Sequence, residues 1–524
     1  MASLKPGSIE DGKSISSDNA APSKTASVVA ASCNSVEITD ILSGQAVDPV
    51  ITKKLNLLNN AIDEIGWTPY HTRLFLLAGF GYAVDSMIIL IKSATLPAIT
   101  KEFNPPYSKG ILVANNIGLI VGALVWGPLA DIVGRKWSFN LSLLICSIAG
   151  LAAGAAPNYI VLCFFASLVA FGAGGNLALD TIVLLEHLPS NKQYTLTLLA
   201  GFWGLGQTFT GLMAWAFLPR YSCESIATCT RANNMGWRYV FWTCCSIVFA
   251  MSILRLTVIR LHETPKYRLA QGRDAEAVET MQKLAKIYNR PCSITLESVQ
   301  ACGETNLRET HAKSYYSVAE ILVHVRGLFR TRDLTISTLL IWLSWAVIGL
   351  AYPLFNVFLP TYLASRGAQF NQLSTDVTWR NYAIVNVCSI FGPLVAGLMA
   401  STFLGRKYTM VIGALATMAF SWAYSTVKSN EGNVAFACMI TFTTNVYYGT
   451  LYAYTPEVLP TAHRSTGNGI AVGFNRIMGL VSTIIGSFVN LNTPVPIYIC
   501  ASLYIVSAIA AALMPFEPRG SRSS

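Results

Sequence analysis

Long apolar runs recur along the chain and are separated by short polar segments. Each run is close to the roughly 20 residues that a helix needs to cross the hydrocarbon core of a bilayer. The pattern predicts twelve spanning helices, at residues 73–98, 110–130, 137–156, 159–186, 195–218, 239–261, 334–363, 379–402, 408–427, 433–456, 466–490 and 496–515. We therefore expect an all-α membrane protein with two six-helix bundles that are pseudo-symmetric halves.

Polar composition marks the segments outside the two bundles. The first 50 residues have no apolar period, which predicts a disordered tail. Leu55, Leu58, Ile62 and Ile65 then follow at helical spacing, so we expect a helix on the inner membrane face. The predicted domains are a cytoplasmic tail with this interfacial helix (1–66), the N-terminal bundle (67–261), a cytoplasmic linker with an amphipathic helix (262–333), the C-terminal bundle (334–515) and a cytoplasmic tail (516–524).

Composition narrows the class of protein. Charged residues make up 12% of the chain, against ~25% in an average soluble domain. This argues against a soluble enzyme of several domains. The net charge is +10, yet the basic clusters interleaved with aromatics that would bind nucleic acid are missing.

Basic residues also predict the orientation in the membrane. The stretch 262–333 holds 11 Lys and Arg residues, and the short loops at Arg135-Lys136 and Arg406-Lys407 are basic. All three lie on one side of a twelve-span arrangement, together with both termini. By the positive-inside rule we assign that side to the cytoplasm.

A loop with glycines and charged residues lies between the second and third predicted spans. It contains Gly127, Asp131, Gly134, Arg135 and Lys136, in which glycines allow a tight turn and the charges anchor the inner face. This pattern resembles the loop motif of the major facilitator superfamily. The resemblance implies that these residues take part in gating between transport states.

The second half carries matching pieces. Gly405 and Arg406 stand at the equivalent loop, although the acidic position is lost. Glu457 and Arg464, at the end of the tenth span, resemble a motif of sugar porters, and Glu186 is the first-half counterpart. The resemblance implies a cytoplasmic network of charges that breaks as the two halves rock.

Other segments narrow the resemblance to one branch. Residues 79–85 and 174–186 are similar to the branch related to synaptic vesicle glycoprotein 2 and its fungal relatives. The seventh span lacks the paired glutamines of sugar porters, so a hexose is a weaker candidate for the substrate. The fifth span lacks the Gly-Pro kink of drug antiporters, which weakens drug export.

Four ionisable residues lie within predicted spans: Asp85, Lys92, Asp180 and Arg476. Such residues are costly in a bilayer, by about 2.5–3.5 kcal/mol on insertion scales, and are functional candidates by default. Asp85 and Lys92 share a helix face two turns apart, and Asp85 is our candidate proton site. The alternatives are structural ion pairs of Arg476 with Asp85 or Asp180, and a Lys92 that reaches the outer interface.

Aromatic and amide side chains are frequent in spans seven and ten. We expect Tyr352, Asn356, Asn445 and Tyr448 to line the substrate path, with ordinary helix packing as the alternative. Cys223 and Cys229 stand six residues apart in a predicted external loop. They can form a disulfide there, or remain free thiols.

The sequence thus predicts a secondary transporter that works by alternating access. No nucleotide-binding P-loop is present, so a gradient must supply the energy, and proton-coupled symport is our reading. Two cations in the path favour a carboxylate or other organic anion over a sugar or polyol. Export of a metabolite or toxin and a receptor that does not transport its ligand are the alternatives.

The remaining expectations concern partners and location. We expect no enzyme activity and no cofactor. The chain has no CxxC pair, so we expect no metal site either. The expected partners are a small-molecule substrate, a proton and the lipid bilayer, with no nucleic acid. We expect a monomer in the plasma membrane with both termini in the cytoplasm.

Overall fold

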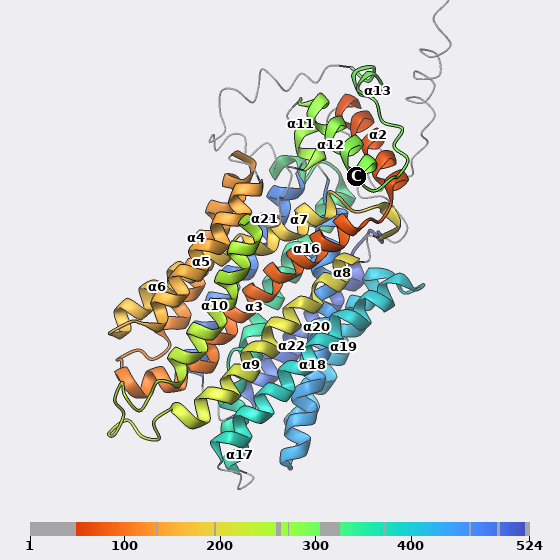
Figure 1. Cartoon of the computed structure of the whole chain (residues 1–524). Coiled ribbons are helices and arrows are strands. Elements are labelled where there is room, and N and C mark those ends of the chain that lie inside the picture. Colours follow the sequence, from red (N-terminus) through yellow and green to blue (C-terminus); the bar gives the residue numbers. More distant parts are fainter. Residues whose placement is uncertain are drawn as a thin grey trace, which may run out of the picture.

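Helices are the regular elements of the structure, a computed structural model (Figure 1). It describes residues 49–132, 135–192, 195–257, 264–270, 272–303, 325–369, 374–460, 463–489 and 493–518. Throughout these ranges no strand occurs. This agrees with the long apolar runs of the sequence, because a helix satisfies its backbone hydrogen bonds within one segment.

The N-terminal bundle follows the first six predicted spans. Its helices are α3 (Pro69–Phe103), α4 (Gly110–Ile132), α5 (Arg135–Gly154), α6 (Tyr159–Ala173), α7 (Asn176–Leu185), α8 (Thr195–Leu199), α9 (Gly201–Tyr221) and α10 (Gly236–Thr257), with the short 3-10 helix η1 (Ser190–Lys192) before α8. The predicted span 159–186 is divided at Gly174-Gly175. A Cβ at Gly175 would lie 2.3 Å from the Cβ of Trp126, so the two glycines let this helix press against α4.

The C-terminal bundle contains α16 (Arg332–Asn356), α17 (Leu359–Gln369), α18 (Thr375–Ser401), α19 (Gly405–Tyr424), α20 (Asn430–Val458), α21 (Arg464–Phe488) and α22 (Val495–Leu513). The predicted span 334–363 is divided between α16 and α17. Pro353 lies in the last turn of α16, and Pro360 lies in the first turn of α17. Proline is accepted in a first helical turn, where its missing N–H would have no partner.

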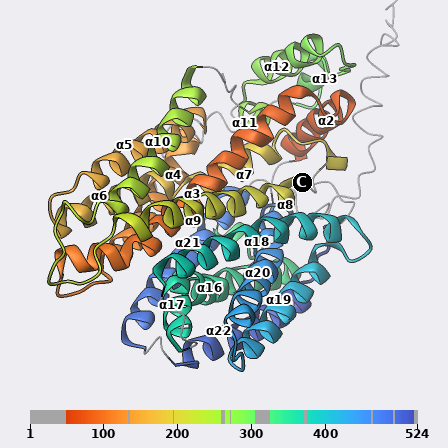
Figure 2. The same ribbon diagram turned by 60° about the horizontal axis from the view of Figure 1, so that its bottom comes forward.

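Figure 2 shows the two bundles side by side, with helices α3 to α10 in one and α16 to α22 in the other. Helix α9 crosses closely onto α18 between them. A Cβ at Gly204 would lie 2.6 Å from the backbone nitrogen of Ile390. Small residues at such crossings let helix backbones approach in a membrane.

Within the described residues, 6 helices are long and apolar enough to cross a membrane by length and composition. Helices α9, α19 and α20 are not among them although they have 21, 20 and 29 residues. Helix α20 has buried hydroxyl and amide side chains such as Thr441, Thr444 and Asn445. Polar residues that face a bundle interior lower the apolarity of a span without exposing it to lipid.

A third unit packs at one end of the bundles (Figure 1). It consists of α2 (Pro49–Ile65), α11 (Pro265–Ala270), α12 (Asp274–Ile287) and α13 (Leu296–Gln300). Leu58, Ile62 and Ile65 of α2 are buried in one hydrophobic cluster with Val278 and Met281 of α12. The apolar face that we expected on the membrane is therefore covered by the linker helices, because they offer a matching apolar stripe.

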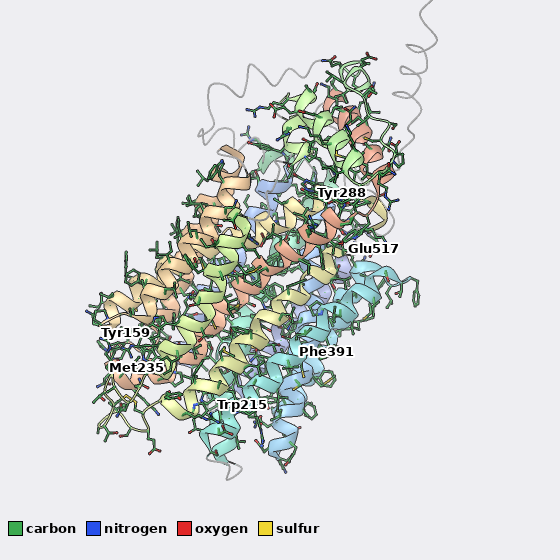
Figure 3. All side chains as sticks on the ribbon, in the orientation of Figure 1. Tyr159, Trp215, Met235, Tyr288, Phe391 and Glu517 are labelled. Carbon is green, nitrogen blue, oxygen red and sulfur yellow. A yellow bond between two sulfur atoms is a disulfide. The ribbon has the colours of Figure 1, made fainter. Side chains whose placement is uncertain are left out.

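A buried acidic group joins α3 to α10 at the opposite end of the N-terminal bundle. Glu102 accepts hydrogen bonds from Arg238 (2.7 and 2.9 Å), Trp237 (2.9 Å) and Asn234 (2.9 Å). Figure 3 shows Met235 of the same turn at this end of the molecule, far from Tyr288. Both side chains of the Glu102–Arg238 pair are nearly inaccessible to solvent.

Replacement of Glu102 tests how much its contact with Arg238 stabilises the folded protein. Glu102→Gln leaves the buried Arg238 guanidinium without a counter-charge, and breaking such a pair costs about 3 kcal/mol. We expect a lower midpoint of thermal unfolding in detergent, followed by tryptophan fluorescence. Glu224→Gln, in an exposed position of the neighbouring loop, is the control and should unfold like the parent protein; equal midpoints for both variants would contradict the expectation.

Candidate functional site

One ion pair connects the two bundles at mid-height. Nη2 of Arg476 on α21 lies 3.2 Å from Oδ1 and 3.3 Å from Oδ2 of Asp85 on α3. Both side chains are buried, and Asp85 has no exposed surface. The pair is thus one of the two structural alternatives that the sequence left open for Arg476.

A small cavity lies between the bundles next to this pair. Its volume is about 40 Å³. It is lined by Ile89, Leu112, Asn115, Asn116, Leu119, Trp203, Ile348, Gly349, Tyr352, Pro353, Val357, Tyr448, Asn475, Arg476, Gly479 and Thr483. Helices of both bundles contribute, so a ligand bound here would contact both halves.

Two of the predicted lining residues do line the cavity and two do not. Tyr352 and Tyr448 are part of its wall. Asn356 and Asn445 are buried outside this set and donate to carbonyls of their own helices, Tyr352 (3.3 Å) and Thr441 (2.8 Å). Their amides therefore serve helix packing in this structure.

Aromatic rings form one continuous cluster on the cavity wall. The centroid of Tyr448 lies 5.4 Å from Tyr352, 4.9 Å from Tyr452 and 5.9 Å from Trp203, and Trp345 lies 4.6 Å from Tyr452. Ring pairs at such separations attract each other beyond their burial. The cluster draws on α9, α16 and α20, so it spans both bundles.

Hydrogen bonds hold the phenols of this aromatic cluster in place. Trp203 Nε1 donates to the Tyr352 hydroxyl (3.2 Å), and Gln207 donates to the same oxygen. The Tyr448 hydroxyl donates to Asn475 Oδ1 (3.4 Å). The ring faces are thereby presented in fixed orientations.

Sequence reasoning missed other wall residues, among them Trp203, Asn115 and Asn116. Trp203, like its neighbour Trp345 in the aromatic cluster, is an ordinary tryptophan within an apolar run and gives no signal of its own. Asn115 and Asn116 did carry a signal, because two adjacent amides in a predicted span are costly unless they face a polar interior. Asn116 donates to Thr483 of the other bundle (3.1 Å).

Lys92 points to this wall as well. Its Nζ donates to Asn115 Oδ1 at 2.6 Å, and the residue is 1% exposed. It does not reach the outer surface, which was one alternative. Its charge lies in the N-terminal bundle, two helical turns from Asp85.

Asp180 is the second buried acid of the N-terminal bundle. Its Oδ1 lies 3.9 Å from Nη2 of Arg255 on α10, and neither carboxylate oxygen has a hydrogen-bond partner among the described residues. A Cβ at Gly81 would lie 1.6 Å from Asp180 Oδ2, so only glycine leaves room for this carboxylate. Arg255 escaped the sequence analysis because it lies near the end of its apolar run, where charges are common.

The gating residues of the second half form a compact group at the end near α2. Arg406 Nη2 lies 2.6 Å from Glu457 Oε1, and both side chains are buried. Glu517 of the C-terminal segment accepts from the backbone N–H of Arg406 (3.0 Å) and Lys407 (2.9 Å) at the start of α19. Gly405 has φ +63°, a conformation that favours glycine.

The other predicted gating residues lie at helix ends or outside the described residues. Arg464 is buried at the first position of α21, and Glu186 is buried directly after α7. In the first-half loop, Gly127 lies in α4 and Gly134 is outside the described residues. The side chains of Asp131, Arg135 and Lys136 are likewise outside the described part of the chain.

The loop cysteines are joined in the structure. Cys223 and Cys229 form a disulfide with a Cα–Cα distance of 5.3 Å. Lys101 Nζ donates to the Cys223 carbonyl (3.0 Å), and the Cys223 N–H donates to Asn234 (3.3 Å). The disulfide loop is thus held on the same end of α3 as Glu102.

Comparison with known proteins gives one family. The family model described as "Major Facilitator Superfamily" matches residues 74–482. The chain is 40% identical to an "MFS siderochrome iron transporter 1" of Ceriporiopsis subvermispora over 92% of this chain and 94% of that protein. It is 25% identical to the "Niacin transporter NiaP" of Acinetobacter baylyi (82% and 89%), and 24% identical to the "Synaptic vesicle 2-related protein" of Bos taurus (88% and 81%).

A solved structure shares the fold. The proton:xylose symporter XylE bound to 6-bromo-6-deoxy-D-glucose superposes with a TM-score of 0.67 at 16% identity, over 87% of this chain and 98% of that one. At this identity the likeness concerns the arrangement of helices alone. It confirms the predicted two-bundle helical fold.

The loop disulfide can be tested by thiol labelling. We expect Cys223 and Cys229 to resist a maleimide reagent under non-reducing conditions in detergent and to react fully after mild reduction, because a disulfide has no free thiol. Peptide mass spectrometry separates them from the other cysteines. Modification of either residue without reductant would show that the pair is open.

Proposed function

Because the chain belongs to the major facilitator superfamily, as its motifs predict, we propose that this transporter moves a small organic anion by proton-coupled symport. The family and fold are those of transporters and not of enzymes. The single observation that carries the proposal is the Asp85–Arg476 pair beside the cavity between the bundles. It places a cation where a substrate would contact both halves.

Arg476 is the proposed anchor for the anion. A guanidinium offers a planar fork that matches a carboxylate with two parallel hydrogen bonds. In the described structure its Nη2 is engaged with Asp85 and the residue also lines the cavity. A substrate carboxylate would therefore compete with Asp85 for the same cation.

This competition supplies a reason for proton coupling. The buried pair carries no net charge, and adding an anion would leave one uncompensated negative charge in a buried site, which is strongly unfavourable. Protonation of Asp85 restores neutrality and releases Arg476 to the substrate. One proton would thus enter with each monoanion.

The aromatic cluster supports an aromatic carboxylate as the substrate class. Trp203, Tyr352 and Tyr448 line the cavity, and an aromatic ring stacks favourably on such faces. A relative is named as a niacin transporter, and niacin is a small aromatic carboxylate. A ring on the aromatic wall and a carboxylate on Arg476 would use both features together.

A second candidate comes from the relative named as a siderochrome iron transporter. An iron chelate is much larger than nicotinate or benzoate and would require the halves to separate more widely around the cavity. Sugars and polyols are weaker candidates, because neither needs the buried cation. A receptor that does not transport its ligand is the remaining alternative.

We propose that the end with α2 and α11–α13 faces the cytoplasm, at the plasma membrane. In the predicted twelve-span arrangement, the basic stretch 262–333 and the loops at Arg135 and Arg406 lie on the same side of the membrane as α2. The protein would act as a monomer, since each chain contains both halves of the cavity.

Uptake into proteoliposomes tests the substrate class. We expect accumulation of nicotinate and benzoate, driven by an inward proton gradient, and little uptake of xylose, sorbitol or a ferric siderophore. Arg476→Lys keeps the charge but loses the fork, so we expect its apparent affinity to fall about tenfold or more. Arg220→Gln, at an exposed position, is the control; equal affinities in Arg476→Lys and the parent would remove the proposed anchor.

The coupling role is tested separately with the two acids. Asp85→Asn imitates the protonated acid permanently, so accumulation against a gradient should be lost while exchange of labelled for unlabelled substrate persists. Asp376→Asn, at an exposed position of α18, should behave like the parent. If Asp85→Asn still accumulates substrate, the pair is structural and Asp180 becomes the coupling candidate; loss of exchange as well would place Asp85 in the binding site or the fold.

A further inference from the structure

Two neighbouring acids at the end of α2 bind in two directions, one to the N-terminal bundle and one to the linker within the third unit. Asp63 accepts from the backbone N–H (2.7 Å) and the hydroxyl (2.8 Å) of Ser190, the first residue of η1. Glu64 accepts from the backbone N–H (2.8 Å) and the hydroxyl (2.6 Å) of Ser293 in the linker. We call these four residues the serine clamp.

The serine clamp compensates an unfavourable placement of charge. Two adjacent carboxylates lie in the last turn of α2, where the helix dipole disfavours anions. Each receives a backbone and a hydroxyl donor from a serine, which offsets that repulsion. The contact therefore depends on each serine remaining an uncharged donor.

Ser293 combines exposure with an irregular backbone. The residue is exposed and lies in the non-helical segment between α12 and α13, where its neighbours on both sides have no regular structure. Arg290 precedes it by three residues and is also exposed. An exposed serine in a segment without regular structure, with arginine three positions before it, suits a protein kinase that selects basic substrates.

We propose that Ser293 is a phosphorylation site of an arginine-directed protein kinase and that its modification releases α2. In the reaction the Ser293 hydroxyl oxygen bonds to the γ-phosphorus of ATP. The bond from that phosphorus to the β,γ-bridging oxygen breaks and ADP leaves. The hydroxyl proton passes to the kinase base and then to solvent.

The product opposes the contact that Ser293 now makes. A phosphoserine carries −1.5 to −2 charges at neutral pH, in round figures, and has no hydroxyl to donate. It would stand directly against the Glu64 carboxylate, which now lies 2.6 Å from the hydroxyl oxygen. Like-charge repulsion replaces the hydroxyl hydrogen bond and opposes the remaining backbone one, so the linker side of the serine clamp opens.

Opening at this point would be felt in the membrane domain. Helix α2 ends at Ile65 and α3 begins at Pro69, so only three residues separate α2 from the helix that carries Asp85. The inner end of α3 is held by His71, whose Nε2 lies 2.9 Å from the carbonyl of His187. Release of α2 would leave this helix end with fewer restraints.

The test uses the full chain, purified in detergent, with Mg-ATP and the catalytic subunit of an arginine-directed kinase. We expect phosphate on Ser293 by peptide mass spectrometry, lost in Ser293→Ala and strongly reduced in Arg290→Gln. Ser298→Ala is the matched control, since Ser298 lies in the same region but bonds to Thr295 and not to α2. It should be phosphorylated like the parent.

Hydrogen–deuterium exchange then measures whether α2 is released. The amides of α2 should exchange about tenfold faster in the phosphorylated protein, because charge-assisted bonds are lost and repulsion is added. In Glu64→Gln, phosphorylation should increase the exchange of the α2 amides less than in the parent protein, since the opposing charge is gone. No phosphate on Ser293, or phosphate with unchanged exchange of α2, would overturn the proposal.

The site has meaning in cells only with the proposed cytoplasmic orientation, because ATP and such kinases act there. The two experiments above do not depend on that orientation or on transport. Failure of the proposed function would leave their outcome unchanged. Failure of the phosphorylation would in turn leave the transport proposal intact.

Discussion

The contact on which the site depends is the buried ion pair between Asp85 and Arg476. Two charges in a membrane interior are tolerable only together, since removing one strands the other in a medium that cannot solvate it. One charge lies on α3 and the other on α21, so each bundle supplies what the other needs. The pair therefore links the two halves through a single buried carboxylate.

The surroundings of the pair follow from the same constraint. Polar groups near it must be hydrogen-bonded, and the described ones form short chains such as Tyr452 to Tyr448 (3.4 Å) and Tyr448 to Asn475 (3.4 Å). Aromatic residues satisfy two demands there, because a ring is apolar while a phenol or indole tip donates a hydrogen bond. This explains why α20, with its buried hydroxyl and amide side chains, can pack in the interior of the bundles.

The unit of α2 and α11–α13 obeys different physics. It has its own hydrophobic cluster and a buried Lys54–Asp274 pair at 2.6 Å. Ser190 of η1 binds the Asp63 carboxylate of this unit, and within the unit Ser293 binds Glu64; water and charge can alter both contacts easily. The bundles are held by buried packing, whereas Glu64 and Ser293 are exposed to solvent.

By itself the sequence determined the class of fold, the two-bundle plan and most of the charged residues that matter. Apolar run length depends on bilayer thickness alone, and motifs such as Gly127 to Lys136 are local patterns that need no knowledge of distant contacts. It likewise singled out Asp85, Asp180 and Arg476, because a charge in an apolar run is visible in one dimension.

Only the tertiary structure decided which of these charges meet. Arg476 was open to Asp85 or Asp180, and the pairing depends on how α21 packs against α3 across 391 residues of chain. The same holds for Arg255, for Trp203 and Trp345 of the aromatic cluster, and for the apolar face of α2. Their partners come from distant segments, so no local period or spacing carries the information.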